Sequence, residues 1–258
     1  MAQLSLVIGN RNYSSWSLRP WLLLRHAAIP FEEIQLQFYE RADGHVGVTG
    51  IERYSPTGKV PLLMVDGEPV WDSLAICETL AELHPEKALW PADPRARRTA
   101  RAITAEMHSG FQALRSAMPM NIRGSFPGEG DTPAVQRDIA RIIAIWSACR
   151  EQHGAAGPML FGRFSVADAF YAPVVMRFFT YAVALPAECV AYAEAVRALP
   201  AMREWMDAAQ RETAFLAAEE PYVLQQVSQQ VLQQLSQQPG SGPQPESAAG
   251  QVNSPAPR

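Results

Sequence analysis

The hydrophobic pattern at the start of the chain predicts a strand, a helix and a second strand. An apolar run at 4–8 predicts a short strand. Apolar residues at helical spacing from Leu18 onward predict a helix that begins in the serine-rich stretch 14–17. Residues 31–38 alternate between apolar and polar types, as in a strand with one exposed face, and the polar stretch 41–57 predicts a loop with one helical turn. Strand, helix and strand in this order predict a βαβ unit with a right-handed crossover.

A hairpin and a second helix complete the predicted N-terminal domain. The apolar runs 60–65 and 68–71 flank an Asp-Gly dipeptide, which is typical of a tight hairpin turn. Asp72 or Ser73 caps the helix that follows, and a His-Pro dipeptide at 84–85 ends it. The first 84 residues therefore predict one mixed sheet built in the order β-α-β and then β-β-α.

Beyond this point the chain shows only helical patterns. The predicted helices are 93–118, 133–153, 169–179, 187–198 and 201–211, with a glycine-rich loop at 121–131. The predicted organisation is a mixed α/β domain (1–84), a linker (85–94), an all-helical domain (95–220), a glutamine-rich amphipathic helix (221–238) and a disordered tail (239–258). The tail is rich in Pro, Gly, Ser and Gln and cannot bury enough apolar surface to offset its chain entropy. The glutamine-rich segment is either a weakly ordered helix or a helix that binds a partner.

Composition narrows the class of protein. The chain is 48% hydrophobic and 19% charged, as in folded proteins, and its net charge of −4 provides no basic field for a nucleic acid. Three widely spaced cysteines without a CxxC pair suit a reducing cytoplasm and predict small buried apolar residues. No signal peptide and no membrane span are predicted. The five histidines show no metal-binding spacing, so no metal site is expected.

The serines at the start of the first helix carry the candidate chemistry. Their hydroxyls lie at the positive end of a helix dipole, a position that favours an anion. One of these serines can also act simply as a helix cap while the others have no role. Spacing alone leaves both interpretations open.

At four places the residues resemble the cytosolic glutathione transferase superfamily. The stretches that carry the resemblance are Ser14-Ser15-Trp16-Ser17, Lys59-Val60-Pro61-Leu62, Asp72-Ser73-Leu74-Ala75-Ile76 and Phe164-Ser165-Val166-Ala167-Asp168-Ala169. The resemblance covers about residues 4 to 215. It implies a thioredoxin-like N-terminal domain, an all-helical C-terminal domain and a homodimer. The serine cluster is most similar to that of the zeta class, which includes maleylacetoacetate isomerases.

The resemblance implies that Ser14 is the catalytic serine, with Ser15 as the main rival. The hydroxyl would donate a hydrogen bond to the glutathione sulfur. A thiol with a pKa of about 8.5 is mostly protonated at neutral pH, and a donor at a helix N-terminus favours the nucleophilic thiolate. Trp16 stands where the zeta class has cysteine, which weakens the isomerase interpretation, and it would wall the substrate pocket.

The resemblance also implies a set of glutathione-binding residues. A cis Val60–Pro61 bond would let the Val60 backbone pair with the cysteinyl unit, as one strand pairs with another. Ser73 and the local amides would hold the γ-glutamyl carboxylate, and Asp72 would pair with its ammonium. Lys59 would meet the glycyl end. His45 lies where relatives contact the same carboxylate, although a plain surface histidine fits the sequence equally well.

Two residues of the helical domain complete the predictions. The Ser165-x-x-Asp168 pattern predicts a capping box, so Asp168 is assigned a structural role. Arg177 could meet an anionic substrate, although an internal salt bridge is the preferred interpretation. We expect a glutathione transferase that acts on a small electrophile. The alternatives are a glutathione-dependent cis–trans isomerase of a maleyl-type acid and a non-catalytic module of the same fold.

Overall fold

A four-stranded mixed sheet with the order β2-β1-β5-β6 organises the first part of the computed structural model, which describes residues 2–223. Strand β1 (Leu4–Ile8) pairs in parallel with β2 (Glu32–Gln35) and antiparallel with β5 (Leu62–Val65). Strand β6 (Glu68–Val70) pairs antiparallel with β5, across the turn that contains Asp66 and Gly67. The predicted βαβ unit and the predicted hairpin are both confirmed.

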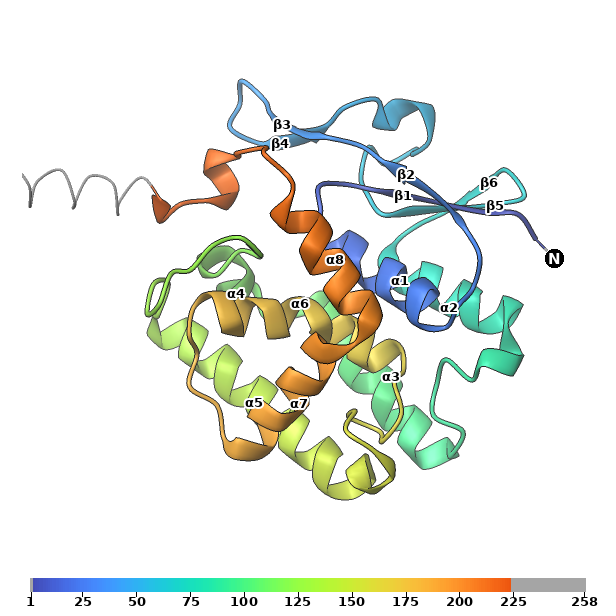
Figure 1. The fold of residues 1–258 in the computed structure, drawn as a ribbon, viewed down its shortest axis with the longest axis vertical. Coiled ribbons are helices and arrows are strands. Elements are labelled where there is room, and N and C mark those ends of the chain that lie inside the picture. The colour runs from blue at the N-terminus through green and yellow to red at the C-terminus, as the bar shows by residue number, and fades with distance from the viewer. Residues whose placement is uncertain (1, 224–258) are drawn as a thin grey trace, which may run out of the picture. The chain divides into compact units, whose positions relative to one another are not determined.

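Helices α1 (Ser15–His26) and α2 (Ser73–Leu83) lie below this sheet in Figure 1. Ser14 caps α1 and Asp72 caps α2, so both helices begin where the sequence placed them. Helix α1 is buried along most of its length because it packs between two parts of the molecule. It contacts β1 and α2 of the sheet domain and α6 and α8 of the helical domain. Most of its buried residues are apolar, as a helix covered on several sides requires, with Arg19 as the charged exception.

The segment after β2 differs from the prediction. Residues 31–38 were expected to form one strand, but β2 ends at Gln35 and β3 (Phe38–Glu40) pairs with β4 (Val46–Val48) in a separate two-stranded sheet. The side chain of Asn10 explains the break, because its Oδ1 accepts the Phe38 amide at 2.6 Å and its amide group donates to Gln37. Gly9 is required beside this turn, since a Cβ there would lie 2.2 Å from the ring of Phe38. The loop prediction for 41–57 was therefore wrong at β4, although a helical turn, η1 (Ile51–Arg53), is present.

A connection with the short helix η2 (Pro85–Lys87) and the buried plug of Leu89 and Trp90 leads to the helical domain. The single helix predicted over 93–118 is in fact two helices, α3 (Pro94–Ser109) and α4 (Gln112–Ala117). The chain turns at Gly110 and at Phe111, whose φ is +62°. Arg115 stabilises the turn by donating to the carbonyls of Gly110 and Met107 at the end of α3.

Four further α-helices agree with the predictions: α5 (Pro133–His153), α6 (Val166–Thr180), α7 (Ala187–Ala198) and α8 (Pro200–Gln210). Two short 3-10 helices, η3 (Gly154–Ala156) and η4 (Ala217–Glu219), were not predicted. Helix α6 is the buried centre of this half and contacts α1, α3 and α7. The Ser165–Asp168 capping box is confirmed, and burial raises the pKa of Asp168 to about 6. The mixed α/β part and the all-helical part together confirm the predicted fold class.

Within residues 2–223, no helix combines the length and the apolar character needed to cross a membrane. The predicted tail at 239–258 and all but the first three residues of the predicted helix at 221–238 lie outside the described residues. The cysteines at 77, 149 and 189 are free and buried, as predicted.

Candidate active site

Two adjoining cavities open where the sheet domain meets the helical domain. The first has a volume of about 330 Å³ and the second of about 410 Å³, and they share Trp16, Lys59 and Val60 as common walls. The first is also lined by Tyr13, Ser14, Ser15, Phe38, Val46, Val48, Gly58, Arg115, Pro119, Arg177 and Glu219. The second is also lined by Thr57, Pro61, Trp71, Asp72, Ser73 and His108. All the predicted site residues except His45 therefore line one of these two neighbouring spaces.

The two candidate serines have different hydrogen-bond partners. Both line the first cavity and both are 5% exposed. Ser14 caps α1: its hydroxyl donates to Ser17 Oγ at 2.7 Å and accepts the Ser17 amide at 3.4 Å. Ser15 Oγ accepts a hydrogen bond from Arg177 Nη2 at 3.3 Å and donates to no group in residues 2–223. The proton of Ser15 is therefore available to a ligand, whereas that of Ser14 is already used.

Arg177 does not form the internal salt bridge that was predicted. Within residues 2–223 it has no carboxylate at ion-pair distance, and it donates instead from Nε to the Met118 carbonyl at 2.9 Å and from Nη1 to the Pro173 carbonyl at 3.4 Å. Its side chain is buried because α6 lies at the centre of the helical domain. Burial, and then the neighbouring charge of Arg115, lower the pKa of Arg177 to about 10, so it remains protonated at neutral pH.

Trp16 forms a wall between cations. The guanidinium of Arg115 lies 4.8 Å from the centre of its ring, and that of Arg19 lies 4.0 Å away. Arg19 is fully buried between Trp16 and Phe170, and none of its side-chain nitrogens has a hydrogen-bond partner in residues 2–223. Sequence analysis missed Arg19 and Arg115. A charge inside the otherwise apolar pattern of α1 was the available signal for Arg19.

The second cavity begins at the N-terminus of α2. One oxygen of Asp72 accepts the amides of Leu74 at 2.9 Å and Ala75 at 3.3 Å, and the other lies 3.0 Å from Nε2 of His108 on α3. Ser73 is buried, and its hydroxyl has no partner in the described part of the chain. A buried hydroxyl without a partner is costly, so this one is suited to a polar ligand. His108 was not predicted, because its contact with Asp72 spans two domains.

The loop between the cavities contains the predicted cis bond, since the Val60–Pro61 peptide is cis. Among the side-chain, loop and cap hydrogen bonds of residues 2–223, none uses the amide or the carbonyl of Val60. Lys59 lines both cavities. His45 lies apart: its side chain is 81% exposed, contacts Asp43 at 3.3 Å and lines neither cavity.

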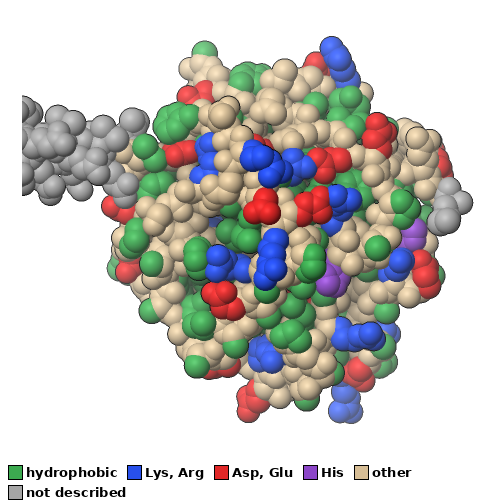
Figure 2. Space-filling view, viewed as in Figure 1, with side chains coloured by type: hydrophobic (Ala, Val, Ile, Leu, Met, Phe, Trp, Pro, Cys, Tyr) green, Lys and Arg blue, Asp and Glu red, His purple; other side chains and the backbone are tan. Residues whose placement is uncertain are grey.

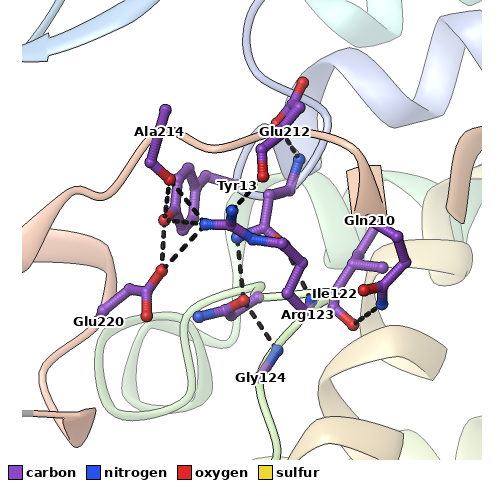
Figure 3. Close-up of polar contacts among 10 residues, drawn as sticks. Tyr13, Ile122, Arg123, Gly124, Gln210, Glu212, Ala214 and Glu220 are labelled. Atoms are coloured by element: carbon purple, nitrogen blue, oxygen red, sulfur yellow. Dashed lines mark hydrogen bonds and ion pairs between the residues drawn. The ribbon is translucent and has the colours of Figure 1, made fainter. Parts of the chain in front are cut away.

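A polar cluster joins Tyr13 and Arg123 to the segment 212–220 that follows α8 (Figure 3). The hydroxyl of Tyr13 contacts the Ala214 carbonyl at 3.0 Å and the Glu220 carboxylate, and it accepts a hydrogen bond from Arg123 at 2.9 Å. Arg123 also donates to the carbonyls of Glu212 and Ala214. Burial, assisted by the Glu220 carboxylate, raises the pKa of Tyr13 to about 12. The ring of Tyr13 thus lines the cavity while its hydroxyl is engaged in this cluster.

Charges on the surface are mixed in sign. Basic and acidic side chains are interspersed over the face drawn in Figure 2, in keeping with the small net charge of −4. Within residues 2–223, no three His, Cys, Asp or Glu side chains are grouped so as to hold a metal ion. Two arginines, Arg115 and Arg177, line the first cavity together with Lys59 and Glu219.

Comparison with known families gives two matches. The family model described as the glutathione S-transferase N-terminal domain matches residues 13–83. The model described as the glutathione S-transferase C-terminal domain matches residues 130–208. These segments lie inside the predicted α/β domain and the predicted helical domain.

Individual relatives agree with the family models. A maleylacetoacetate isomerase of Pseudomonas aeruginosa is 31% identical over 163 residues, which cover 62% of this chain and 76% of that protein. A probable maleylacetoacetate isomerase of Caenorhabditis elegans is 35% identical over 106 residues, 41% of this chain and 47% of the relative. The match thus spans about half the length of the nematode relative.

Solved structures show the same fold. A glutathione transferase homologue from Burkholderia with bound glutathione superposes with a TM-score of 0.61 at 22% identity, covering 81% of this chain and 100% of that one. An Omega 2S glutathione transferase from Trametes versicolor, in complex with 2,4-dihydroxybenzophenone, gives 0.61 at 20% identity and covers 90% of this chain and 99% of that one.

Proposed function

The chain belongs to the glutathione S-transferase family, and from this premise we propose that it activates the thiol of glutathione for attack on a small electrophile. The observation that carries the proposal is the position of Ser15. Its unused hydroxyl proton faces the first cavity at the start of α1, next to the cavity that contains the unpartnered hydroxyl of Ser73. The first cavity thus contains a hydroxyl that can donate to the glutathione sulfur, and the adjoining cavity contains a hydroxyl that can bind the γ-glutamyl end of the tripeptide.

The two cavities support a placement of the parts of the tripeptide. The γ-glutamyl end would occupy the second cavity, with its carboxylate on Ser73 at the start of α2 and its ammonium near Asp72. The cysteinyl unit would pair with the backbone of Val60, and Lys59 would meet the glycyl carboxylate. His45 is left out of this assignment because its exposed side chain lines neither cavity.

Ser15 is the better candidate for the hydroxyl that donates to sulfur. Resemblance alone favoured Ser14, but the proton of Ser14 is engaged with Ser17. A hydroxyl that donates to a thiolate at a helix N-terminus stabilises the anion, and the displaced thiol proton goes to solvent. The thiolate then attacks the electrophile in the first cavity, whose apolar wall is formed by Phe38, Val46 and Val48.

A second candidate function is favoured by the names of the relatives. The Pseudomonas and nematode proteins are a maleylacetoacetate isomerase and a probable one, so glutathione-dependent isomerisation of a maleyl-type acid is the alternative. In isomerisation the thiolate adds and then leaves, and glutathione is regenerated. Consumption of glutathione therefore separates transferase from isomerase. A homodimer remains a prediction based on the family resemblance, and a cytoplasmic location remains a prediction based on the cysteine pattern of the sequence.

The test is a titration with glutathione, followed by the ultraviolet absorbance of the bound thiolate as a function of pH. Wild-type protein should bind glutathione and ionise its thiol below pH 8.5, the approximate value of a free thiol. Ser15→Ala should retain binding and lose turnover about a hundredfold, the order found when one donor to a developing anion is removed. Binding without turnover on any electrophile or maleyl acid would instead identify a non-catalytic module, and absence of binding would refute the proposal.

A further inference from the structure

Three arginines surround the first turn of α1. Arg19 and Arg177 are buried and Arg115 is partly buried, and none of them forms an ion pair in the described residues. The charges affect one another, since burial and then Arg115 and Arg177 lower the pKa of Arg19. Buried charge without a counterion is strongly unfavourable. Arg115 and Arg177 line the first cavity, so the arrangement suits an anion that enters or forms there.

Of these three residues, Arg177 contacts a candidate catalytic hydroxyl. Its Nη2 donates to Ser15 Oγ at 3.3 Å, while Nε and Nη1 are held by the carbonyls of Met118 and Pro173. Each nitrogen of the guanidinium thus has a protein partner, so its position is set before a ligand binds. Because Ser15 accepts from Arg177, its own proton is directed to another acceptor.

The other groups that face Arg177 do not remove its charge. Arg115 comes from α4 and adds a second positive charge. Glu219 comes from η4 and lines the same cavity, but it forms no ion pair with Arg177, and burial raises its pKa. The phenol of Tyr181 donates to the Pro119 carbonyl, and burial raises its pKa so that it stays neutral. The guanidinium therefore keeps a net positive field toward Ser15.

We propose that Arg177 is a positioning residue for thiol activation: it holds Ser15 as a hydrogen-bond acceptor, so that Ser15 donates to the glutathione sulfur, and it supplies the buried positive charge that balances the thiolate. This inference rests on the proposed function. The step is an ionisation in which the S–H bond breaks, the electron pair stays on sulfur and the proton leaves to solvent. The competing role for Arg177 is to bind a carboxylate of the electrophile.

The test compares two variants that separate charge from shape. Arg177→Gln removes the charge and keeps a donor for a carbonyl, whereas Arg177→Lys keeps the charge. The midpoint pH of thiolate absorbance in the glutathione complex should rise by about one pH unit in Arg177→Gln, since an opposite charge within a few ångströms shifts a pKa by that order. Arg177→Lys should show a smaller rise. Glutathione affinity at low pH, where the thiol is protonated in every variant, should stay within about twofold, an interval that corresponds to a small free-energy difference.

A matched control and a double variant complete the design. Arg203→Gln removes the same charge from an exposed position of α8 outside both cavities and should leave the midpoint unchanged. If Arg177 acts through Ser15, the Arg177→Gln/Ser15→Ala protein should show a smaller rise than the sum of the single changes, because residues in one network are not additive. Additive shifts would contradict the positioning role.

Two outcomes separate this inference from the function on which it rests. An unchanged midpoint in both Arg177 variants, with a higher KM only for an acidic electrophile, would overturn the inference and leave the transferase proposal intact. Failure of the wild-type protein to bind glutathione would refute the proposed function itself. If Arg177→Gln does not fold, as judged by thermal unfolding, the midpoint of Arg177→Lys decides, since loss of the Ser15 contact must still raise it.

Discussion

The N-termini of α1 and α2 are two helix starts that face adjoining cavities but differ in charge. Helix α1 is capped by the neutral, buried Ser14 and has unpaired arginines around its first turn. Helix α2 is capped by Asp72, whose side chain is 57% exposed and contacts His108. Every helix N-terminus favours an anion. At α1 this preference is strengthened, whereas at α2 the protein's own carboxylate offsets it.

The difference suits the two ends of the proposed ligand. The thiolate carries one full negative charge that forms during the reaction, so an uncompensated positive site stabilises it. The γ-glutamyl end is a zwitterion, which needs a donor for its carboxylate and an acceptor for its ammonium. Ser73 can supply the first and Asp72 the second. Under the proposed function, the same structural motif would serve two chemical tasks through the choice of cap and neighbours.

Among the variants that test this difference between α1 and α2, Asp72→Asn should cause the largest loss of glutathione affinity. Asparagine caps a helix about as well as aspartate, so stability should be retained while the charge for the ammonium is lost. We expect glutathione affinity to fall by about fivefold, the upper end for one largely exposed ion pair. Calorimetric titration measures the affinity, and thermal unfolding is the control for the cap.

An unchanged affinity in Asp72→Asn would contradict the proposed difference between α1 and α2. It would show that the negative charge of Asp72 does not contribute to binding of the γ-glutamyl ammonium. Asp72→Ala is the companion variant. It removes both the charge and the cap and should additionally lower the free energy of unfolding by about 1 kcal/mol. A loss of affinity in Asp72→Ala alone would show that the cap and not the charge matters for the ligand.

Replacements of His108 should have an intermediate effect. Its Nε2 lies 3.0 Å from the Asp72 oxygen that does not cap α2, so it orients the carboxylate from the helical domain. His108→Leu removes this contact, and we expect affinity for glutathione to fall by about threefold, because the ligand must then order the carboxylate. His108→Gln can place a donor near the same point and should lie closer to wild type. Equal losses in both variants would point to packing against Trp16 instead.

Which features could be predicted from the sequence depends on the range of the contacts involved. The caps at Ser14 and Asp72 and the Ser165–Asp168 box are set by residues within three positions of one another, and all were found. The β3–β4 hairpin was missed because the Asn10 side chain that ends β2 lies 28 residues from its partner Phe38. A periodic pattern contains no information about such a distant partner.

The same reason explains the errors inside the site. The contact of Arg177 with Ser15 spans 162 residues, and the predicted salt bridge was replaced by carbonyl acceptors that carry no sequence signature. The contacts of Tyr13 with Glu220 and Arg123 join three distant segments. Resemblance identified the residue types around the cavity, whereas the choice between Ser14 and Ser15 required the hydrogen-bond partner of each hydroxyl.

Ser14→Ala should have the smallest effect on ionisation of the bound glutathione thiol. This variant separates the helix-capping role at the start of α1 from the proposed role of donating to sulfur. Ser14 caps the helix through the Ser17 amide and hydroxyl, so its loss should lower the free energy of unfolding by about 1 kcal/mol. The midpoint pH of the bound thiolate should change little, because the proton of Ser14 is already donated within the protein. Ser15→Ala is the matched control, with the opposite pattern of near-normal stability and impaired thiol ionisation. A raised midpoint in Ser14→Ala with a normal one in Ser15→Ala would reverse the two roles, since the cap and the thiol donor would then be the same hydroxyl.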